Sequence, residues 1–572
     1  MAASAAISLW GTLILFWQTL ALASLPLVWL IPQHYLPWLA AHQDVVSLSL
    51  LALAGMVSSQ RQAVPVSWLI AAAGVLASVG LQTAFGPIAF GGDAWMATLY
   101  VVAFAGAIGL GQSLGALGRD HATTLDVLAV GMVGAAVLSV AIALMQWARV
   151  EPLPLPVYGL LPGDRPYANF AQANNFCTAV FLGLCSLCWL RESGRIGGTG
   201  WILGSAYLLF GMTMSGSRTG WLQVALLVML AATIGRRAPQ RVLRLPHALS
   251  LLALLTVFTL AWPALNQVAL LAGTREVAEQ AELGLRWPLW QVALDAIAQH
   301  PLWGYGWQQI PSAQWEVALE HPPMQRYFEH AHNVVLDLML WAGIPIGGLI
   351  AVALGFGLWR QVRATDDARA LWLFAGVLGF FIHALLEQPH AYAYLLMPVG
   401  VAIGVVHALC PGQRELSLPA AGSRVAWAAV TAAITLTAVD YLEVEQNYRA
   451  ARAESTFGSR RIVTPAPELR VLSQLEAFMR FIRTEARPGM ASDELATMRR
   501  VVQRYGHPPA LLRLALAEGL NGQPEAARDT LRRLCAMHLA QRCVEARASW
   551  SALQQQYPVL ASIPAPTVPP AR

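Results

Sequence analysis

The sequence predicts an all-α polytopic membrane protein with about 13 transmembrane helices, a large polar loop before the tenth span and a polar helical domain at the C-terminus. Of its 572 residues, 56% are hydrophobic and 12% are charged, whereas soluble proteins carry about 25% charged residues. The apolar residues also occur in runs of about 20, the length that an α-helix needs to cross a bilayer. These observations exclude a soluble globular protein.

Hydropathy divides the apolar part of the chain into thirteen candidate spans. The first, residues 8–30, has neither a basic leader nor a small-residue cleavage site. We therefore expect it to be a retained span and not a removed signal peptide. The thirteen ranges are 8–30, 45–59, 65–85, 95–114, 124–147, 171–190, 198–214, 217–234, 247–268, 333–358, 368–387, 391–410 and 425–441.

The arginines predict the orientation of these spans. All 37 basic residues are arginine, and the net charge is only +5, so nothing indicates a groove for nucleic acid. The short loops on one side hold only Arg149, Arg165 and Arg218. The positive-inside rule therefore predicts a cytoplasmic N-terminus and a periplasmic C-terminus in a bacterial inner membrane. The loops predicted to be cytoplasmic contain Arg61, Arg119, Arg191, Arg195, Arg236, Arg237, Arg241, Arg244, Arg360, Arg363, Arg369, Arg414 and Arg424.

Two polar segments are predicted to lie in the periplasm, the loop 269–332 and the tail 442–572. We expect a transmembrane domain over 1–441, a helical domain over 442–560 and a disordered proline-rich end over 561–572. Within the helical domain, residues 507–534 have the pattern of two amphipathic helices joined by an Asn-Gly turn, like one tetratricopeptide (TPR) unit. Cys535 and Cys543 could form a disulfide there, but their spacing does not decide it.

Two arginines on the periplasmic side are candidate anion-binding residues. Arg218 lies in SGSRTGW, a tight turn between two spans, where it either anchors the helix at the headgroups or binds a phosphate. Arg286 begins RWPLWQVALDAIAQ, which has the pattern of an amphipathic helix at the membrane interface. Its neighbours Trp287 and Trp290 are also typical of an interfacial belt.

The end of the periplasmic loop contains the sequence His330-Ala331-His332-Asn333. Two histidines two residues apart can bind zinc, but no HExxH pattern or third clustered ligand accompanies them, so no metal site is predicted. A histidine at the membrane surface can instead act as a general base, although a loop histidine is more often only solvated.

A third cluster follows the eleventh span in FIHALLEQPHAYAY. His383 and Glu387 are four residues apart, which predicts that they share one face at the end of a helix. Tyr392 and Tyr394 follow. Ionisable residues in such a place indicate either a functional site or a paired structural set.

Taken together, these segments resemble the O-antigen ligase and polymerase superfamily of lipid-linked glycan transferases. The resemblance rests on SGSRTGW, RWPLW, HPLWGYGW and HAHNVVLDLMLWAGIPIG. RPYANFAQANNFCTAVFLGL and IHALLEQPHAYAYLL are similar to segments of one branch, the bacterial protein O-oligosaccharyltransferases that glycosylate pilins. Gln388 and His390-Ala391 depart from the pattern of that branch. The resemblance covers most of the chain and is densest over 160–400.

This resemblance implies transfer of an oligosaccharide from undecaprenyl-pyrophosphate to Ser or Thr hydroxyls by an inverting reaction that needs no metal or cofactor. It implies that His332 is the base and that Arg218 and Arg286 bind the pyrophosphate. Gln172 and Tyr392 match positions that handle donor or acceptor, and Asn175 and Glu387 are plausible supports. The full set of predicted substrate-binding residues is Arg165, Gln172, Asn175, His330, Asn333, Glu387 and Tyr392.

Three other functions fit parts of the pattern. The acceptor could be lipid A–core, as for an O-antigen ligase, or a growing glycan, as for a polymerase. The RPYANFAQANNF and LLEQPHAYAY segments and the periplasmic tail favour a pilin-like acceptor protein. A transporter of anionic lipid is a more distant alternative, because no internal repeat is visible and the periplasmic arginines gather at one surface.

Overall fold

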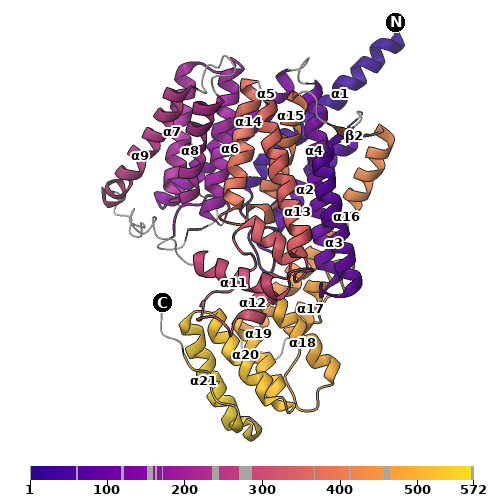
Figure 1. Cartoon of the computed structure of the whole chain (residues 1–572), viewed down its shortest axis with the longest axis vertical. Coiled ribbons are helices and arrows are strands. Elements are labelled where there is room, and N and C mark those ends of the chain that lie inside the picture. The colour runs from indigo at the N-terminus through magenta and orange to yellow at the C-terminus, as the bar shows by residue number, and fades with distance from the viewer. Residues whose placement is uncertain are drawn as a thin grey trace. The chain divides into compact units, whose positions relative to one another are not determined.

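We describe a computed structural model of the chain, in which the α-helix dominates and two short strands are present (Figure 1). Several positively charged loop residues used above to predict orientation (Arg61, Arg119, Arg236, Arg237 and Arg241) lie outside the described residues, as does 269–285. The structure describes residues 2–58, 62–117, 122–150, 159–160, 164–170, 172–234, 244–268, 286–365, 367–410, 414–456 and 464–568.

Each of the thirteen predicted spans coincides with a helix, and the chain is a multi-pass membrane protein. Among the described residues, eight helical segments are long and apolar enough to cross a bilayer. The first, Leu13–Leu30, consists of the second part of α1 (Ala2–Ser24) and the 3₁₀ helix η1 (Leu25–Leu30). The other seven are α3 (Val66–Phe85), α4 (Gly91–Leu117), α5 (Ala122–Trp147), α6 (Ala173–Glu192), α9 (Leu245–Val268), α13 (Val334–Ala364) and α16 (Ala420–Thr456).

The other five predicted spans are helices of 16 or 17 residues. A helix of this length rises roughly 25 Å, somewhat less than the hydrocarbon thickness of about 30 Å. The count of thirteen crossings therefore stays a prediction. These helices are α2 (Ala41–Val57), α7 (Gly198–Met214), α8 (Arg218–Thr233), α14 (Ala368–Ala384) and α15 (Ala393–Leu409).

The chain forms two compact units, each described here by itself. The first comprises 1–73, 99–282 and 352–435, and the second comprises 74–98, 283–351 and 436–572. The predicted boundary between 441 and 442 falls inside α16. The division into a transmembrane domain and a separate helical tail therefore stays a prediction.

Helix α6 is the central helix of the first unit. Inside its most apolar window 94% of the residues are buried, against 28–44% for the other long apolar helices. It packs against α5, α7, α8 and α14 (Figure 1). Close approach depends on small residues such as Gly183, where a Cβ atom would lie 2.3 Å from the Cβ of Ala136. Because protein surrounds α6 on all sides, its first turn is a rigid support for the residues around 172–175.

A small antiparallel sheet also belongs to the first unit. It joins β1 (Gln62–Pro65) to β2 (Glu415–Leu418), with Gln62 opposite Leu418. These strands connect two loops that the arginine pattern predicts to be cytoplasmic.

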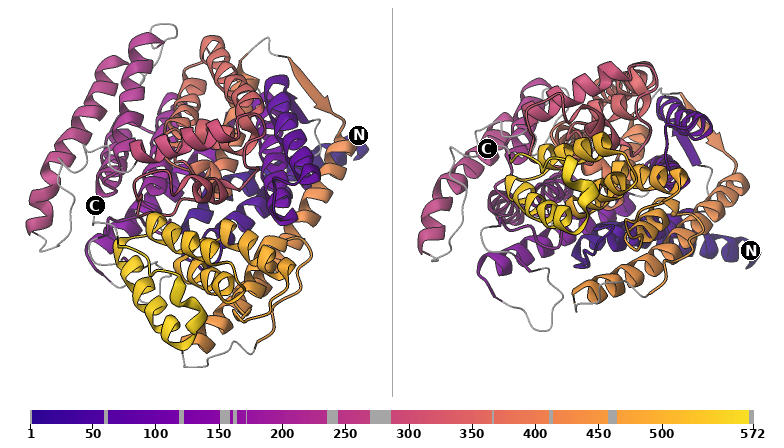
Figure 2. Two further views of the ribbon diagram at one scale, coloured as in Figure 1. Left: turned by 60° about the horizontal axis from the view of Figure 1, so that its bottom comes forward. Right: turned by 90° about the horizontal axis from the view of Figure 1, so that it is seen from below.

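The second unit contains the helices around the loop that was predicted to be periplasmic, and the C-terminal helices. The loop contributes α11 (Arg286–Gln299) and α12 (Ile310–Val317). The C-terminal helices pack in sequence, each against the next (Figure 2). They are α17 (Ser473–Phe481), α18 (Ser492–Arg504), α19 (Pro508–Leu520), α20 (Pro524–Met537) and α21 (Ala540–Gln556), followed by the 3₁₀ helix η3 (Pro558–Ser562).

The predicted helix pair over 507–534 is confirmed as α19 and α20, with Asn521 and Gly522 between them. Gly522 has a φ of 73°, as a tight turn between helices requires. The TPR-like character of the whole domain stays a prediction. Cys535 and Cys543 form a disulfide between α20 and α21, which the sequence left open.

Contacts of the C-terminal end continue beyond the predicted boundary at residue 560. Ile563 is buried, and its carbonyl oxygen accepts a hydrogen bond from the indole of Trp550 at 3.2 Å. The predicted disorder of 561–572 and its boundary stay predictions. Residues 569–572 lie outside the described part of the chain.

Candidate functional site

The His-Ala-His-Asn segment lies directly before α13, and two neighbouring elements fix its backbone. Asp337, in the first turn of α13, accepts hydrogen bonds from Nδ1 of His330 at 3.1 Å and from the N–H of Ala331 at 2.6 Å. The indole N–H of Trp290 in α11 donates to the carbonyl of Ala331 at 3.1 Å. Asp337 and His330 are buried.

His332 follows with a left-handed backbone, at a φ of 54°. A residue other than glycine rarely adopts this conformation, and it costs about 1–3 kcal/mol that the surroundings must supply. Asn333 accepts two backbone hydrogen bonds from the first turn of α13 through Oδ1, at 3.0 and 3.3 Å, and so caps that helix. The half-buried imidazole of His332 meets the ring of Phe328 edge-on, with centroids 5.8 Å apart. The residues directly before and after His332 are thus both fixed by hydrogen bonds.

Arg286 belongs to the same unit as His332, at the first position of α11. Trp290 is four residues further on, so both lie on the same face of the helix. Since Trp290 contacts the backbone of Ala331, this face of α11 is the one beside the His-Ala-His-Asn segment. Trp287 and Leu294 are 56% and 51% exposed, as expected for a helix at the membrane interface. The predicted amphipathic helix is therefore present and begins with the predicted arginine.

Two of the sequence motifs pack against each other near this segment. The turn 301–306, in HPLWGYGW, bonds to residues 340–344, in LWAGI. The N–H of Tyr305 donates to the carbonyl of Leu340 at 2.7 Å, and the N–H of Ile344 donates to the carbonyl of Pro301 at 2.7 Å. Gly343 interrupts the helical geometry with a φ of 74°, and a Cβ there would lie 2.3 Å from a backbone oxygen of the turn. The glycine is needed for this contact.

In the first unit, two predicted arginines meet at the turn 215–218 between α7 and α8. Nη1 of Arg165 donates to the carbonyl of Gly216 at 3.0 Å. Gly216 has a φ of 55°, and a Cβ there would lie 3.1 Å from Cδ of Arg165, so glycine makes room for this side chain. Arg218 is half-buried and is the first residue of α8. Two guanidinium groups beside a helix N-terminus favour an anion.

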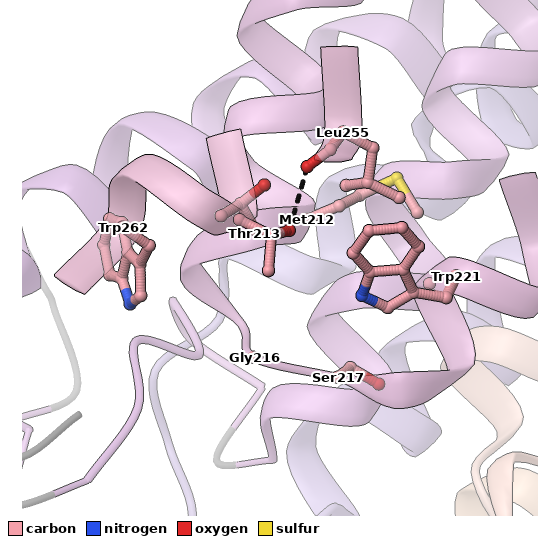
Figure 3. A pocket seen from close by; sticks show the side chains of 9 residues that line it. Met212, Thr213, Gly216, Ser217, Trp221, Leu255 and Trp262 are labelled. Carbon is pink, nitrogen blue, oxygen red and sulfur yellow. Dashed lines mark hydrogen bonds between the residues drawn. The ribbon is translucent and has the colours of Figure 1, made fainter. Parts of the chain in front are cut away.

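A small hollow lies beside this turn, between α7, α8 and α9 (Figure 3). Its empty volume, including the part open to the outside, is about 300 Å³. Trp221 and Trp262 lie on opposite sides of it, and its lining combines apolar side chains with hydroxyl groups. The lining residues are Met212, Thr213, Gly216, Ser217, Gly220, Trp221, Leu255, Thr259 and Trp262.

Three further predicted residues surround the start of α6. Gln172 precedes α6, and its Oε1 is buried with no hydrogen-bond partner among the described residues. Asn175 is buried in the first turn, and its amide donates to the hydroxyl of Tyr394 at 2.8 Å. The rings of Tyr392 and Tyr394 lie 5.3 Å apart. Asn175 therefore ties α6 to α15, while Gln172 presents a polar atom in a buried place.

Glu387 lies just beyond the end of α14 and not on its face. The helix ends at Ala384, although the N–H of Glu387 still bonds to the carbonyl of His383 at 2.8 Å. His383 is fully buried and pairs with the hydroxyl of Thr178 at 2.9 Å, which in turn accepts from Gln223 at 2.9 Å. This network joins α6, α8 and α14. His383 therefore fits the interpretation of its cluster as a paired structural set and not as a functional site. Glu387 is buried at its edge.

The predicted residues therefore form two sets. Arg165, Gln172, Asn175, Arg218, Glu387 and Tyr392 belong to the first unit, and Arg286, His330, His332 and Asn333 belong to the second. Within the second set, the side-chain oxygen of Asn333 caps a helix. Asp337, which holds the segment that carries His332, was not among the predicted residues. Its position four residues after Asn333, in the first turn of a helix, was the available signal.

Comparison with known proteins relates the chain to membrane glycan transferases. Residues 203–353 match the O-antigen ligase family. Residues 370–557 match a family described as the C-terminal part of virulence factor membrane-bound polymerases. The first match contains the turn 215–218, α11 and the His-Ala-His-Asn segment.

Two proteins of Acinetobacter baylyi are similar in sequence. A general O-oligosaccharyltransferase is 29% identical over 530 residues, which are 90% of this chain and 90% of that protein. A ComP-specific O-oligosaccharyltransferase is 30% identical over 250 residues, which are 42% of this chain and 44% of that protein.

Proposed function

Because the chain belongs to the protein O-oligosaccharyltransferases, a family of membrane glycosyltransferases, we propose that it transfers an oligosaccharide en bloc from undecaprenyl-pyrophosphate to Ser or Thr hydroxyls of periplasmic proteins such as pilins. The general oligosaccharyltransferase aligns along 90% of both chains, which supports a protein acceptor. The reaction takes place at the periplasmic face of the inner membrane, with the N-terminus in the cytoplasm.

The observation that carries this proposal is the fixed backbone around His332. Asp337 and Trp290 hold both hydrogen-bonding groups of Ala331, and Asn333 caps the helix that follows. His332 therefore keeps a left-handed conformation that a free loop would leave. A general base must be held within hydrogen-bond reach of the proton that it removes, and such a support serves that purpose.

In the proposed reaction His332 is the base. The hydroxyl oxygen of the acceptor attacks the anomeric carbon from the side opposite the pyrophosphate, and the bond from that carbon to the pyrophosphate oxygen breaks. The acceptor proton passes to the imidazole of His332, and undecaprenyl pyrophosphate leaves. Attack from the opposite side inverts the configuration of the anomeric carbon.

Arginines provide the positive charge for the leaving pyrophosphate. Arg165 and Arg218 lie at the N-terminus of α8, beside the hollow between α7, α8 and α9. Arg286 lies on the face of α11 next to the segment that carries His332. A guanidinium offers two parallel donors to phosphate oxygens. We therefore propose that Arg218 and Arg286 take the role that a divalent metal has in other transferases.

The remaining predicted residues support or contact substrate. The buried Oε1 of Gln172 is suited to accept a hydrogen bond from a sugar hydroxyl or acceptor amide. Tyr392 stands against Tyr394, which Asn175 fixes, so it has a rigid support for contact with substrate. Asn175 and Glu387 then support the residues that contact substrate, and His330 acts through its bond to Asp337.

The test is co-expression with a lipid-linked glycan pathway and a pilin acceptor in a host that lacks its own ligase. The unchanged enzyme should shift the pilin on a gel, and the shift should persist in membranes treated with EDTA. His332→Ala should abolish the shift, and Arg218→Ala should lower the rate roughly 10²–10³-fold. Near-normal glycosylation by both variants, at matched enzyme levels, would disprove the proposed roles.

An O-antigen ligase or polymerase is the second candidate, because the matched families carry those descriptions. The same experiment separates these functions when lipopolysaccharide is blotted beside the pilin. Glycan on lipid A–core, with none on the pilin, would identify a ligase. Lengthened glycan on the lipid carrier alone would identify a polymerase.

A further inference from the structure

The segment 321–332, between α12 and α13, carries His332 but has no helix or strand of its own. It contains two residues with left-handed backbone, Gln325 and His332, both at a φ of 54°. Such a segment has no regular ladder of hydrogen bonds, so other parts of the second unit must hold it in place. Asp337 and Trp290 account for only its last residues.

The C-terminal helices hold the middle of this segment. The N–H of Gln325 donates to the carbonyl of Ala536, at the end of α20, at 2.9 Å. The hydroxyl of Tyr327 donates to the carbonyl of Arg504, at the end of α18, at 2.9 Å. The ring of Tyr327 stacks on the imidazole of His538, with centroids 5.8 Å apart and planes 16° apart. Tyr327 is therefore held by both its hydroxyl and its ring.

The groups that hold Tyr327 are themselves fixed. Nε2 of His538 donates to the carbonyl of Gly506 at 2.7 Å. Burial lowers the pKa of His538 to about 4, so its imidazole is neutral at ordinary pH. The guanidinium of Arg504 pairs with the buried Asp93 at 3.2 Å. The residues that contact Tyr327 are therefore themselves fixed by hydrogen bonds and an ion pair.

Contacts then lead from Tyr327 to His332. Gln314 in α12 binds the residues on both sides of Tyr327. Its amide donates to the carbonyl of Arg326 at 2.7 Å, and its Oε1 accepts from the N–H of Phe328 at 2.9 Å. The buried ring of Phe328 then meets the edge of the His332 imidazole.

Helix α12 is held in turn by α20. Nε of Arg533 donates to the carbonyl of Trp315 at 2.9 Å, and its guanidinium lies 4.9 Å from the centre of that indole ring. The same C-terminal helix therefore fixes both the segment that carries Tyr327 and the helix that clamps it.

We infer that the C-terminal helices position the catalytic base, and that Tyr327 is the positioning residue through which they act on His332. This inference rests on the proposed role of His332. It assigns to the tail a part in the transfer step itself, and not only in stability or in acceptor docking. Loosening Tyr327 should therefore lower the turnover rate while leaving binding of the lipid-linked donor nearly unchanged.

The test uses the purified full-length enzyme in nanodiscs, with undecaprenyl-pyrophosphate-linked oligosaccharide and a pilin acceptor. Displacement of a catalytic group by about 1 Å can cost roughly 10²-fold in rate. Tyr327→Ala should lower kcat by about that factor, with a KM for the donor within about threefold of the unchanged enzyme. Tyr327→Phe keeps the ring stack, so it should restore most of the rate.

A control variant separates positioning from stability. Tyr448→Ala removes a ring that contacts Phe478 in the same C-terminal region, and it should leave kcat unchanged. An equal loss in Tyr448→Ala, or a normal kcat in Tyr327→Ala, would overturn the inference.

The outcomes also distinguish this inference from the proposed function. If His332→Ala is inactive and Tyr327→Ala is fully active, only the positioning role fails. If His332→Ala is fully active, the role of His332 as the base fails, and the positioning role fails with it.

Discussion

The turn 215–218 and the segment 330–333 each contain a left-handed backbone position at or close to a candidate residue, yet they are held in different ways. Gly216 has a φ of 55° and His332 a φ of 54°. The turn is closed by nearby groups, since the N–H of Gly216 bonds to the carbonyl of Thr213 at 2.9 Å. The segment is held by Asp337 and Trp290 from two separate helices.

This difference shows that one conformation can be encoded locally or imposed by packing. At the turn, glycine itself tolerates the positive φ. At His332 a histidine takes an unfavourable conformation because its neighbours are fixed from outside. The turn should therefore be sensitive to changes within it, and the segment to changes in the residues of α13 and α11 that hold it.

Removal of Asp337 should have the largest effect. Asp337→Ala leaves the buried N–H of Ala331 and the ring of His330 without their acceptor, a loss of about 3–5 kcal/mol in comparable buried pairs. We expect the rate of pilin glycosylation to fall at least about 10²-fold. Asp337→Asn keeps one acceptor oxygen and should lose less. A normal rate in Asp337→Ala, at equal membrane levels, would show that the segment does not depend on this support.

The support from the C-terminal helices should weaken in acid. The pKa of His538 is lowered by burial to about 4, below the ordinary value of about 6.5. The unfolded state then binds more protons between these values, so this residue's contribution is complete above pH of about 6.5 and is lost as the pH falls to about 4. The loss amounts to about 3 kcal/mol.

Thermal unfolding of the purified enzyme from pH 8 to 4 measures this effect, with roughly 3 kcal/mol expected between the extremes. His538→Gln keeps a donor for the carbonyl of Gly506 but does not titrate in this range. Its unfolding should therefore depend less on pH. Equal pH dependence of the two proteins would contradict the prediction.

Alanine at Gly216 should have a smaller effect, confined to the turn. A left-handed backbone costs a residue with a side chain about 1–2 kcal/mol, and the new Cβ would lie 3.1 Å from Arg165. We expect a fall of roughly tenfold in the rate of glycan transfer. Gly200→Ala, in α7 of the same unit, meets no atom within 4 Å and serves as the matched control. Equal activity of the two variants would show that the turn tolerates displacement of Arg165.

The smallest expected effect comes from the second support of the segment. Trp290→Phe removes one hydrogen bond to Ala331 and keeps an aromatic ring in α11, a change of about 1 kcal/mol. The turnover rate should fall less than about tenfold. Trp287→Phe changes an exposed tryptophan of the same helix and should leave the rate unaltered. A larger loss in Trp287→Phe would show that α11 acts through the membrane surface instead.

Much of the architecture was predictable because its signals are local. Apolar runs located the thirteen helices, and the Asn-Gly turn located the pair α19 and α20. Arg286 was expected at the start of a helix, and α11 begins at that residue, while its place at the membrane interface stays a prediction. Asn333 caps α13 through its side-chain oxygen, as asparagine often does before the first turn of a helix, and its contact with substrate also stays a prediction.

The sequence by itself determined a multi-pass helical membrane protein and the segments proposed to carry its chemistry, because hydropathy and motifs report on neighbouring residues. Only the tertiary structure decided how those segments are held. The donor to the carbonyl of Ala331 and the acceptor for the hydroxyl of Tyr327 lie on other helices, 41 and 177 residues away in the chain. Periodicity carries no information about contacts at such separation, since they depend on how the finished helices pack.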